Sequence, residues 1–383
     1  MRKHTNIEHK NAKQEKEILF VTTAHKRYDT RIFSKECSYL KNKFGYNISL
    51  LVADGNGNEV TNNIRIYDIG ASANKFKRYS TTLFKTFLFI RKLDISVIHI
   101  HDPELIFISY FLKKIGKIKV IYDVHEDFHL AMIDRPYLNK FLRNIIATTF
   151  MVFENYISKQ FDFIITATPS INKRFKKLNR SATINNYPII NELNSSKIRK
   201  KQQQICYLGS IDLNRGIAEV VDSLTMVNGQ LKLAGFFDPI SVRNKLIERK
   251  GWEKVHELGI INRDEAASLF SESIAGICTF HPLSNHINSQ PNKIFEYMSS
   301  GLPVIISNFP IWEKIIEKYN CGISVNPLDP KSISDGINYL LNNHEIAYNL
   351  GQNGLKAIKN ELNWDKEVEK LNTIYKKLLC EII

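Results

Sequence analysis

The chain has 383 residues, of which 43% are hydrophobic and 24% charged, and this composition excludes a disordered protein. Its five scattered cysteines form no CxxC pair, which excludes a zinc ribbon and a disulfide framework. No apolar run is long enough to span a bilayer and no signal peptide is visible, so we expect a cytoplasmic protein. The whole net charge of +14 lies in residues 1–190, which hold 31 lysines and arginines against 17 acidic residues. This excess predicts a polyanionic partner for the first half, either a membrane surface or nucleic acid. The alternative is a basic surface that serves only solubility.

Short apolar runs alternate with longer polar stretches after a polar tail at residues 1–16, which we expect to be solvated. Such runs, rich in Ile, Val and Phe, predict the strands of a parallel sheet covered by helices on both faces. In the first half they lie at residues 18–22, 48–53, 97–100, 120–124 and 163–167. They predict an N-terminal Rossmann-like domain over residues 17–190.

The lysine-rich stretch 191–204 interrupts this pattern and is predicted to be a linker. Two successive β/α halves of similar size predict an α/β fold of two doubly wound domains, the second over residues 205–360. Ligands of such sheets bind outside the carboxyl ends of the strands, so we expect the functional site in the cleft between the domains. The apolar runs of the second half lie at residues 205–208, 231–234, 275–279, 304–307 and 322–325.

The most specific segment is residues 290–310, with the sequence QPNKIFEYMSSGLPVIISNFP. Pro291 suits the first turn of a helix, which Gly301 would end. The free N–H groups at the start of this helix can bind a pyrophosphate, and Glu296, one turn in, can accept hydrogen bonds from two ribose hydroxyls. The alternative is an ordinary amphipathic helix with a surface glutamate.

This segment resembles the second-domain signature of the family 4 retaining glycosyltransferases, Glu-x7-Glu followed by a small-residue turn and G-x-P-V-I. The resemblance implies a GT-B fold and a nucleoside diphosphate sugar donor, UDP- or GDP-linked, whose ribose is bound by Glu296, the second glutamate of the signature. Backbone amides near Asn292, Lys293 and Ile294 would then bind its phosphates. Asn288 stands where the family has the first glutamate, which contacts the donor sugar, so the handling of the sugar is left open.

Residues 208–217, LGSIDLNRGI, resemble the family's G-R-x4-K-G loop, whose two cations neutralise the diphosphate of the donor. Gly209 matches the first glycine, and Arg215 matches the lysine, although a surface residue at a helix start is the alternative. Ser210 stands where the family usually has arginine, so one cation is missing or is supplied from elsewhere. Because no DxD pair flanks a sugar site, we expect lysine, arginine and helix dipoles to stabilise the leaving diphosphate, with no cofactor and no catalytic metal.

Two apolar strands of the first half end in histidine and acidic residues, VIHIHDPE at 97–104 and VIYDVHED at 120–127, which places these groups at the edge of the cleft. His125 matches a family histidine that contacts the donor sugar. Asp102 and Glu104 match an HDPE pattern in the branch of the family that makes cell-surface polysaccharides, where they would orient the acceptor hydroxyl. A histidine satisfied within the core is the alternative.

The loop after the first strand, HKRYDTR at residues 25–31, places Arg31 in a D-x-R-I pattern of the same branch. That cation could approach the donor phosphate or an acceptor pyrophosphate, or could join a helix to the sheet.

Residues 75–92 interleave phenylalanines with six cations, which fits an amphipathic element in an anionic membrane interface as well as a core helix with a basic outer face. Basic runs at 113–119 and 173–177 favour the membrane, and no nucleic-acid-binding module is visible.

Residues 364–379 have the apolar spacing of a helix, and the resemblance implies that residues 361–383 cross back onto the first domain.

Together, these motifs predict a retaining glycosyltransferase of the EC 2.4 class that moves a sugar from a nucleoside diphosphate to a sugar hydroxyl. The basic first half and the polysaccharide branch predict a lipid-linked oligosaccharide acceptor in O-antigen, capsule or exopolysaccharide synthesis, with the protein peripheral at the inner face of the cytoplasmic membrane. The alternatives are a nucleotide-sugar epimerase of the same fold and a non-catalytic partner subunit, the latter because of Asn288 and Ser210.

Overall fold

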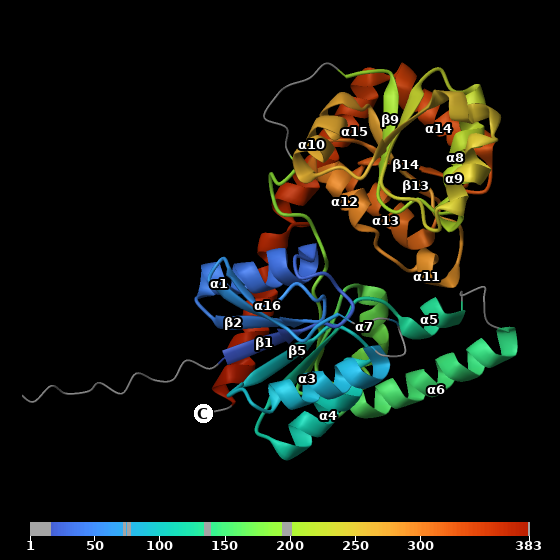
Figure 1. Ribbon diagram of the computed structural model, residues 1–383. Coiled ribbons are helices and arrows are strands. Elements are labelled where there is room, and N and C mark those ends of the chain that lie inside the picture. The colour runs from blue at the N-terminus through green and yellow to red at the C-terminus, as the bar shows by residue number, and fades with distance from the viewer. Residues whose placement is uncertain (1–16, 72–73, 75–77, 134–138, 194–200, 382–383) are drawn as a thin grey trace, which may run out of the picture.

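The protein folds into two α/β domains, drawn one above the other in Figure 1 with the N-terminal domain below. The computed structural model describes residues 17–71, 74, 78–133, 139–193 and 201–381. Each domain has a central sheet, fully parallel in the C-terminal domain and parallel except for one pair of strands in the N-terminal domain, which confirms the predicted pair of doubly wound domains. The predicted tail at residues 1–16 lies outside the described residues.

The N-terminal domain is built on an eight-stranded sheet with the order β3-β4-β2-β1-β5-β6-β7-β8, in which only the pair β3–β4 is antiparallel. Its strands are β1 (Glu17–Val21), β2 (Asn47–Val52), β3 (Glu59–Thr61), β4 (Ile64–Asp68), β5 (Val97–Ile100), β6 (Lys119–Val124), β7 (Phe163–Thr166) and β8 (Ser181–Thr183). In β1, Ile18 and Phe20 pack on one face of the sheet, while Leu19 and Val21 pack on the other. This burial on both faces explains why the central strands read as continuous apolar runs.

Helices cover both faces of this sheet. One face carries η1, α1 and the C-terminal helix α16, and the other face carries α3, α4, α6 and α7. The helical segments of the domain are η1 (Thr30–Cys37), α1 (Ser38–Phe44), η2 (Arg78–Thr82), α3 (Leu83–Ile90), α4 (Leu105–Ile115), α5 (Phe128–Ile133), α6 (Lys140–Ser158) and α7 (Pro169–Phe175).

The C-terminal domain has a six-stranded parallel sheet with the order β11-β10-β9-β12-β13-β14. Its strands are β9 (Gln204–Leu208), β10 (Gln230–Ala234), β11 (Val255–Gly259), β12 (Ala275–Cys278), β13 (Val304–Ser307) and β14 (Gly322–Val325). Helices α8, α9 and α14 pack on one face, and α10, α12 and α13 pack on the other. The helical segments are η3 (Leu213–Arg215), α8 (Ile217–Ser223), η4 (Leu224–Met226), α9 (Ser241–Ile247), η5 (Lys250–Lys254), α10 (Arg263–Glu272), α11 (Ser284–Ile287), α12 (Asn292–Ser299), α13 (Pro310–Tyr319), α14 (Pro330–Asn342), α15 (His344–Asn360) and α16 (Trp364–Cys380).

Four strands have no counterpart in the sequence prediction: β3, β4, β8 and β11. Each lies at or next to an edge of its sheet, and β3, β8 and β11 contain no fully buried residue. An edge strand buries little side-chain surface, so its sequence does not show the continuous apolar run that marks a central strand.

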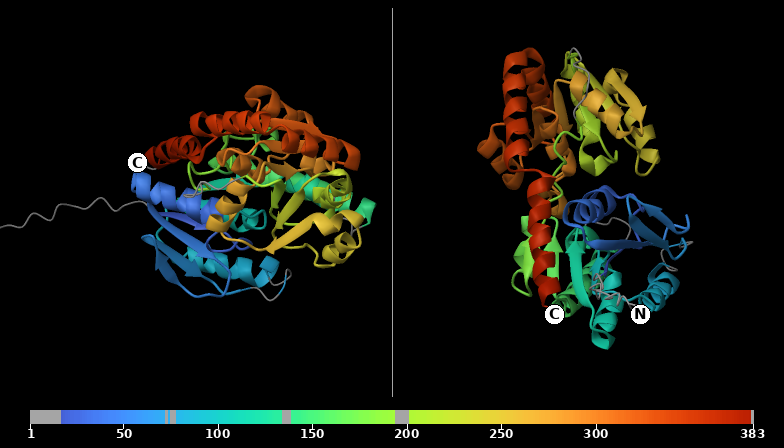
Figure 2. Two further views of the ribbon diagram at one scale, coloured as in Figure 1. Left: turned by 90° about the horizontal axis from the view of Figure 1, so that it is seen from above. Right: turned by 90° about the vertical axis from the view of Figure 1, so that its left-hand side faces the viewer.

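The chain crosses between the domains twice, and Figure 2 shows the two crossings beside each other. The first crossing follows β8, and the second leads from α15 into α16. The N–H of Trp364 donates to the carbonyl oxygen of Pro188 at 2.9 Å, so the two crossings are hydrogen-bonded to each other. Trp364 and Tyr375 are fully buried in the core of the N-terminal domain, so α16 belongs to the domain that begins the chain.

Candidate functional site

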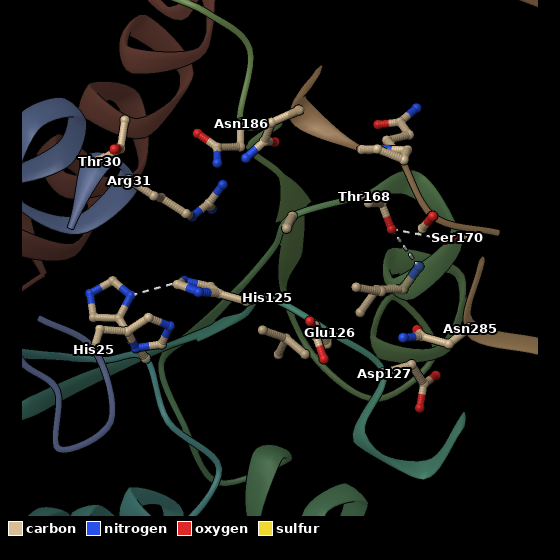
Figure 3. Close-up of a pocket in the computed structure, with 18 of the residues that line it drawn as sticks. His25, Thr30, Arg31, His125, Glu126, Asp127, Thr168, Ser170, Asn186 and Asn285 are labelled. Atoms are coloured by element: carbon tan, nitrogen blue, oxygen red, sulfur yellow. Dashed lines mark hydrogen bonds between the residues drawn. The ribbon is translucent and has the colours of Figure 1, made fainter. Parts of the chain in front are cut away.

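An open cavity of about 1080 Å³ lies between the two domains, and both contribute to its walls. The N-terminal wall includes His25 after β1, Asp102 after β5 and His125 after β6. The C-terminal wall includes Gly209 after β9 and the beginning of α12. Figure 3 shows His25 and His125 close together within this cavity. The cavity therefore lies at the carboxyl ends of both sheets, where ligands of parallel sheets bind.

The loop after β9 places Arg215 in the C-terminal wall. Asp212 accepts a hydrogen bond from the N–H of Arg215 at 3.1 Å, and its carboxylate lies 2.9 Å from Nε of the same residue. Gly216 follows with φ +70°, and a Cβ at this position would lie 1.9 Å from the carbonyl oxygen of Thr279, so the turn requires glycine. The Arg215 side chain is two-thirds buried and lines the cavity, which argues against a mere surface residue at a helix start.

Lys293 on α12 brings a second cation to the same loop, although residue 210 is serine. A Cβ added to Gly209 would lie 3.0 Å from Nζ of Lys293 and 3.9 Å from Nη1 of Arg215, so both cations flank Gly209. Nζ of Lys293 also lies 3.6 Å from the centroid of the Tyr207 ring. Burial lowers the pKa of Lys293 to about 7.

Glu296 lies one turn further along α12 and also faces the cavity. Its Oε1 accepts a hydrogen bond from Nη1 of Arg263 at 2.8 Å, and Nε of Arg263 lies 3.4 Å from Glu192. The Glu296 side chain is 18% exposed, so it is not the freely solvated glutamate of an ordinary amphipathic helix.

On the N-terminal wall, Asp102 is almost completely buried and holds His25. Its Oδ2 accepts hydrogen bonds from the N–H of Thr23 at 2.6 Å and of Ala24 at 3.1 Å, while its Oδ1 lies 3.0 Å from Nδ1 of His25. Burial alone would raise the pKa of Asp102, but its hydrogen bond to His25 and the charge of that ring hold it below its usual range. Glu104 is held close by, because Oγ1 of Thr23 donates to its Oε1 at 3.1 Å.

His125 continues this group of rings. Its ring centroid lies 5.2 Å from that of His25, and its Nε2 lies 3.2 Å from Nδ1 of His101 and 3.3 Å from Oδ2 of Asp123. His101 is buried, and burial lowers its pKa to about 4, so this ring is neutral near pH 7. His125, with 19% of its side chain exposed, therefore lies between His25 at the cavity and the buried His101 and Asp123.

Arg31 occupies the centre of a buried charge cluster, and it shares the carboxylate of Asp123 with His125. Its guanidinium donates to both carboxylate oxygens of Asp123, at 2.9 and 3.0 Å, and to the carbonyl oxygen of Ile184 at 2.9 Å. Its Nε lies 3.1 Å from Glu36. These contacts favour the role of joining η1 to the sheet over the predicted contact with a phosphate.

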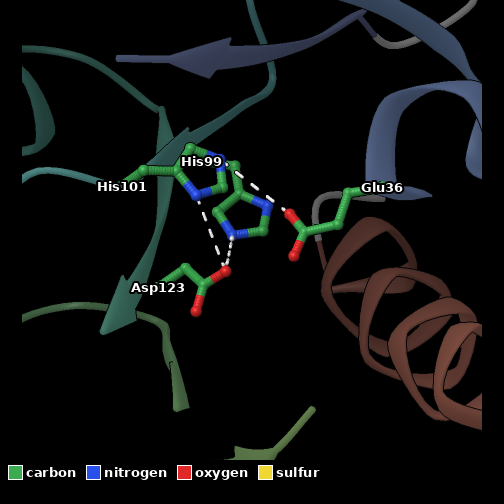
Figure 4. Close-up of side chains that lie close together, drawn as sticks. All are labelled: Glu36, His99, His101 and Asp123. Carbon is green, nitrogen blue, oxygen red and sulfur yellow. Dashed lines mark ion pairs between the residues drawn. The ribbon is translucent and has the colours of Figure 1, made fainter. Parts of the chain in front are cut away.

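Four side chains of this cluster could in principle hold a metal ion, as Figure 4 shows: Glu36, His99, His101 and Asp123. Their potential ligand atoms lie within 4.8 Å of one another, and all four residues are buried. The guanidinium of Arg31 already pairs with both carboxylates, so the positive charge that a metal would bring is present as a side chain. The expected absence of a catalytic metal remains a prediction.

Most residues predicted from the sequence line this cavity: Arg31, Asp102, Glu104, His125, Gly209, Arg215, Asn288, Asn292, Lys293 and Glu296. Ser210 and Ile294 are not among the lining residues. The carbonyl oxygen of Ser210 accepts a hydrogen bond from the Tyr207 hydroxyl at 2.6 Å. Ile294 is fully buried and its N–H donates to the carbonyl oxygen of Pro291 at 3.2 Å, which argues against a phosphate contact from this amide.

The sequence interpretation did not single out His25, Arg263 or the side chain of Lys293. His25 follows a central strand as His101 and His125 do, so its position after β1 was the available signal. Arg263 comes from a helix start far from α12 in sequence, and no local pattern links it to Glu296. The lysine of the NKIFE segment was assigned only a backbone role, because helical spacing does not show that its side chain reaches Gly209.

Two family models match the chain. The model described as Glycosyltransferase Family 4 matches residues 37–186, and the model described as Glycosyl transferases group 1 matches residues 189–357. The two matches follow the two domains of the structure. In sequence and fold, the chain is a family 4-like glycosyltransferase.

Similar proteins support this family assignment. Two uncharacterised glycosyltransferases of Methanocaldococcus jannaschii are 23% identical over 45% of this chain and 25% identical over 49% of it. These alignments cover 47% and 48% of the two proteins, so they span about half the length of these curated relatives.

Solved structures show the same fold over nearly the whole chain. Sucrose-phosphate synthase from Thermosynechococcus elongatus matches with a TM-score of 0.79 at 16% identity, over 96% of this chain and 100% of that one. Anabaena HepE in complex with UDP-glucose matches with a TM-score of 0.72 at 13% identity, over 95% and 99% of the two chains. WaaG, a glycosyltransferase involved in lipopolysaccharide biosynthesis, matches at 0.64 and 12%, over 93% and 99%.

The contact between His25 and Asp102 predicts how His25 titrates. Burial lowers the pKa of His25, but the hydrogen bond and the charge of Asp102 outweigh this and raise it above 6.5. In Asp102→Asn the desolvation remains and the charge is lost, so the pKa of His25 should fall relative to the wild type, as measured by NMR titration of the ring protons. Asp264→Asn, on the exposed side of α10, should leave the titration unchanged; an unaltered His25 in Asp102→Asn would refute the pairing.

Proposed function

We propose that the protein transfers a glycosyl group from a nucleoside diphosphate sugar to a hydroxyl of an acceptor, with retention of configuration. The observation that carries the proposal is the cavity itself, in which Arg215 and Glu296 of one wall face His25 and His125 of the other. Structures of the similar HepE contain UDP, or UDP-glucose, which supports a nucleotide sugar as the donor.

The donor would bind mainly to the C-terminal wall. Its diphosphate lies at Gly209 in this proposal, where Arg215 can neutralise the charge that develops on the leaving phosphate. The ribose hydroxyls lie at Glu296, whose Oε1 is oriented by Arg263. Fixed charges that already point at the leaving group stabilise it more strongly than mobile charges in solution, because they need no reorganisation during the reaction.

The N-terminal wall would hold the transferred sugar and the acceptor. His125 faces the cavity and is oriented by His101 and Asp123, which suits a contact with the donor sugar. The carboxylate of Asp102 accepts hydrogen bonds from backbone amides and contacts His25, so we assign Asp102 as a positioning residue that acts through the His25 ring. With retention, the leaving phosphate accepts the proton of the acceptor hydroxyl on the same face of the sugar, and no enzyme nucleophile is needed.

The acceptor in this proposal is a lipid-linked glycan of polysaccharide synthesis, collected at an anionic membrane. The predicted membrane element at 75–92 is only partly described, because residues 75–77 and the side chain of Arg78 lie outside the described residues. In its described part, α3 buries Thr86 and Ile90 and exposes Phe84 and Leu88. Within the described ranges, none of the helices has the length and apolarity that a membrane crossing requires.

A larger apolar surface on the same domain supports the proposal. We call it the α3–α4–α6 surface; in Figure 1 these three helices lie together on the lower side of the N-terminal domain. Phe107 of α4 and Phe153 of α6 are in contact, with ring centroids 4.6 Å apart. Its exposed apolar side chains are Phe84, Leu88, Phe107, Phe111, Ile115, Phe141, Leu142, Ile145, Ile146, Val152, Phe153 and Tyr156.

The charge of the α3–α4–α6 surface suits an anionic bilayer. Glu154, the acidic residue within α6, is buried, and the sequences of α3 and α4 contain no acidic residue. Lys85, Lys114 and Lys159 are exposed on or beside these helices. Apolar side chains enter the interface while lysines approach lipid phosphates, and each cation contributes about 1 kcal/mol of binding.

The ribose contact is tested by Glu296→Gln. The change keeps the shape of the side chain but replaces a charge-assisted hydrogen bond by a neutral one, so donor binding should weaken by about 1–3 kcal/mol in calorimetry with UDP and GDP. Glu317→Gln, exposed on α13, is the matched control and should bind as the wild type does. Unchanged affinity in Glu296→Gln would remove this residue from the nucleotide site.

Metal independence is tested with a chelator. Because arginine and lysine side chains are proposed to neutralise the diphosphate, glycosyl transfer should continue in excess EDTA. Complete loss of transfer that manganese or magnesium restores would contradict the proposal.

Membrane binding is tested by sedimentation with vesicles. The wild type should bind anionic vesicles at low salt and neutral vesicles weakly, and high salt should reduce the binding to its apolar part, because exposed charges are screened beyond about 8 Å at physiological ionic strength. Changing Phe141 and Val152 together to Ser should remove that apolar part. Changing Lys245 and Lys356 of the other domain to Gln should have no effect. A wild type that ignores anionic vesicles, or whose α3–α4–α6 surface forms a dimer instead, would contradict the proposal.

A further inference from the structure

The ammonium group of Lys293 is buried without a counter-charge in contact with it. The residue is 6% exposed, and within the described part of the chain its Nζ has no hydrogen-bond partner. A buried ammonium without a partner is destabilising, so this side chain is favourable only when the amine is neutral or a ligand supplies negative charge.

The surroundings of Lys293 show where that ligand would lie. The aromatic rings of Tyr207 and Phe280 lie against the ammonium, with centroids 3.6 and 5.3 Å from Nζ. The lysine lines the cavity at Gly209, and the absence of a side chain there leaves room for a ligand to approach Nζ. Arg215 also lies near Gly209 and packs over Phe280, with Cζ 5.3 Å from the ring centroid.

We propose that the side chain of Lys293 is a second diphosphate-binding group, which acts together with Arg215 at Gly209. The inference rests on the proposed function, since the diphosphate is that of the donor. The sequence predicted that Lys293 contributes only its backbone amide at the start of a helix. In this proposal its charged side chain, which extends to the loop after β9, binds the diphosphate. Lys293 in this way provides the cation that Ser210 does not.

The burial of Lys293 gives the site a dependence on pH. Its pKa is lowered to about 7, mainly by burial and in part by the charge of Arg215, while Cys278, Glu296 and Asp212 act in the opposite direction. A bound diphosphate adds negative charge and raises this pKa, so at pH 7.5–8 binding draws a proton from the solvent to Nζ. Diphosphate affinity should therefore fall as the pH rises above about 7.

The test is calorimetry with UDP, GDP and inorganic pyrophosphate on the full chain. In Lys293→Met, which fills the same volume with an apolar side chain, affinity should fall about tenfold to a hundredfold because a charged hydrogen bond is lost. Lys293→Arg should retain most of the affinity. Lys245→Met, on exposed α9, controls for the loss of one positive charge and should bind as the wild type does.

Proton uptake is the readout that a merely structural lysine would not change. Titrations at pH 8 in two buffers of different ionisation enthalpy should show uptake on binding to the wild type. Both Lys293→Met and Lys293→Arg should abolish it, the first because no amine remains and the second because arginine stays charged. Equal affinity and unchanged proton uptake in Lys293→Met would overturn the inference while leaving the proposed function intact. Pyrophosphate binding that depends on Lys293, without binding of UDP or GDP, would support the cation pair and refute the nucleotide sugar donor.

Discussion

The ion pair between Arg31 and Asp123 holds together the N-terminal half of the cleft. Asp123 is fully buried; burial alone would raise its pKa, but the charge of Arg31 keeps it well below the usual range, so it stays ionised. The same carboxylate lies against His101 and His125, and its arginine joins η1 to β6 and to the segment after β8. Removing either partner would leave a buried charge uncompensated, at a cost of about 3–5 kcal/mol. The orientation of His101 and His125 depends on this pair.

The position of the two domains depends on the segments that cross between them. Lys35 of η1 donates to the carbonyl oxygens of Asn186 and Tyr187 at 3.2 and 2.7 Å, so the first crossing is anchored to the N-terminal domain. The second crossing is anchored by α16, where Glu367 accepts a hydrogen bond from the N–H of Asn185 at 3.1 Å. A third contact lies at the cavity itself, because the hydroxyl of Ser170 donates to the carbonyl oxygen of Asn288 at 2.9 Å.

The two walls of the cavity differ in how they carry charge. In the N-terminal wall, charged groups are paired with one another, as in Asp102 with His25 and Arg31 with Asp123. In the C-terminal wall, Arg215 pairs with Asp212 and Arg263 with Glu296, but Lys293 has rings of Tyr207 and Phe280 beside it and its Nζ has no hydrogen-bond partner among the described residues. A paired wall suits neutral sugars and hydroxyls, and a wall with an uncompensated cation suits a diphosphate. This difference in charge supports the assignment of donor phosphates to one domain and of sugar chemistry to the other.

The sequence by itself determined the two doubly wound domains, because central parallel strands must be apolar on both faces and therefore show as unbroken runs such as residues 18–22 and 304–307. It also located Glu296, Arg215 and His125, because residues just after strands and at helix starts face the cleft in this fold. Only the tertiary structure showed that Arg31 forms a buried ion pair with Asp123, that Ile294 lies in the core and that the Lys293 side chain reaches Gly209. The contacts of Arg31 and Lys293 join segments 80 or more residues apart, which the local spacing of side chains along a helix or strand does not encode.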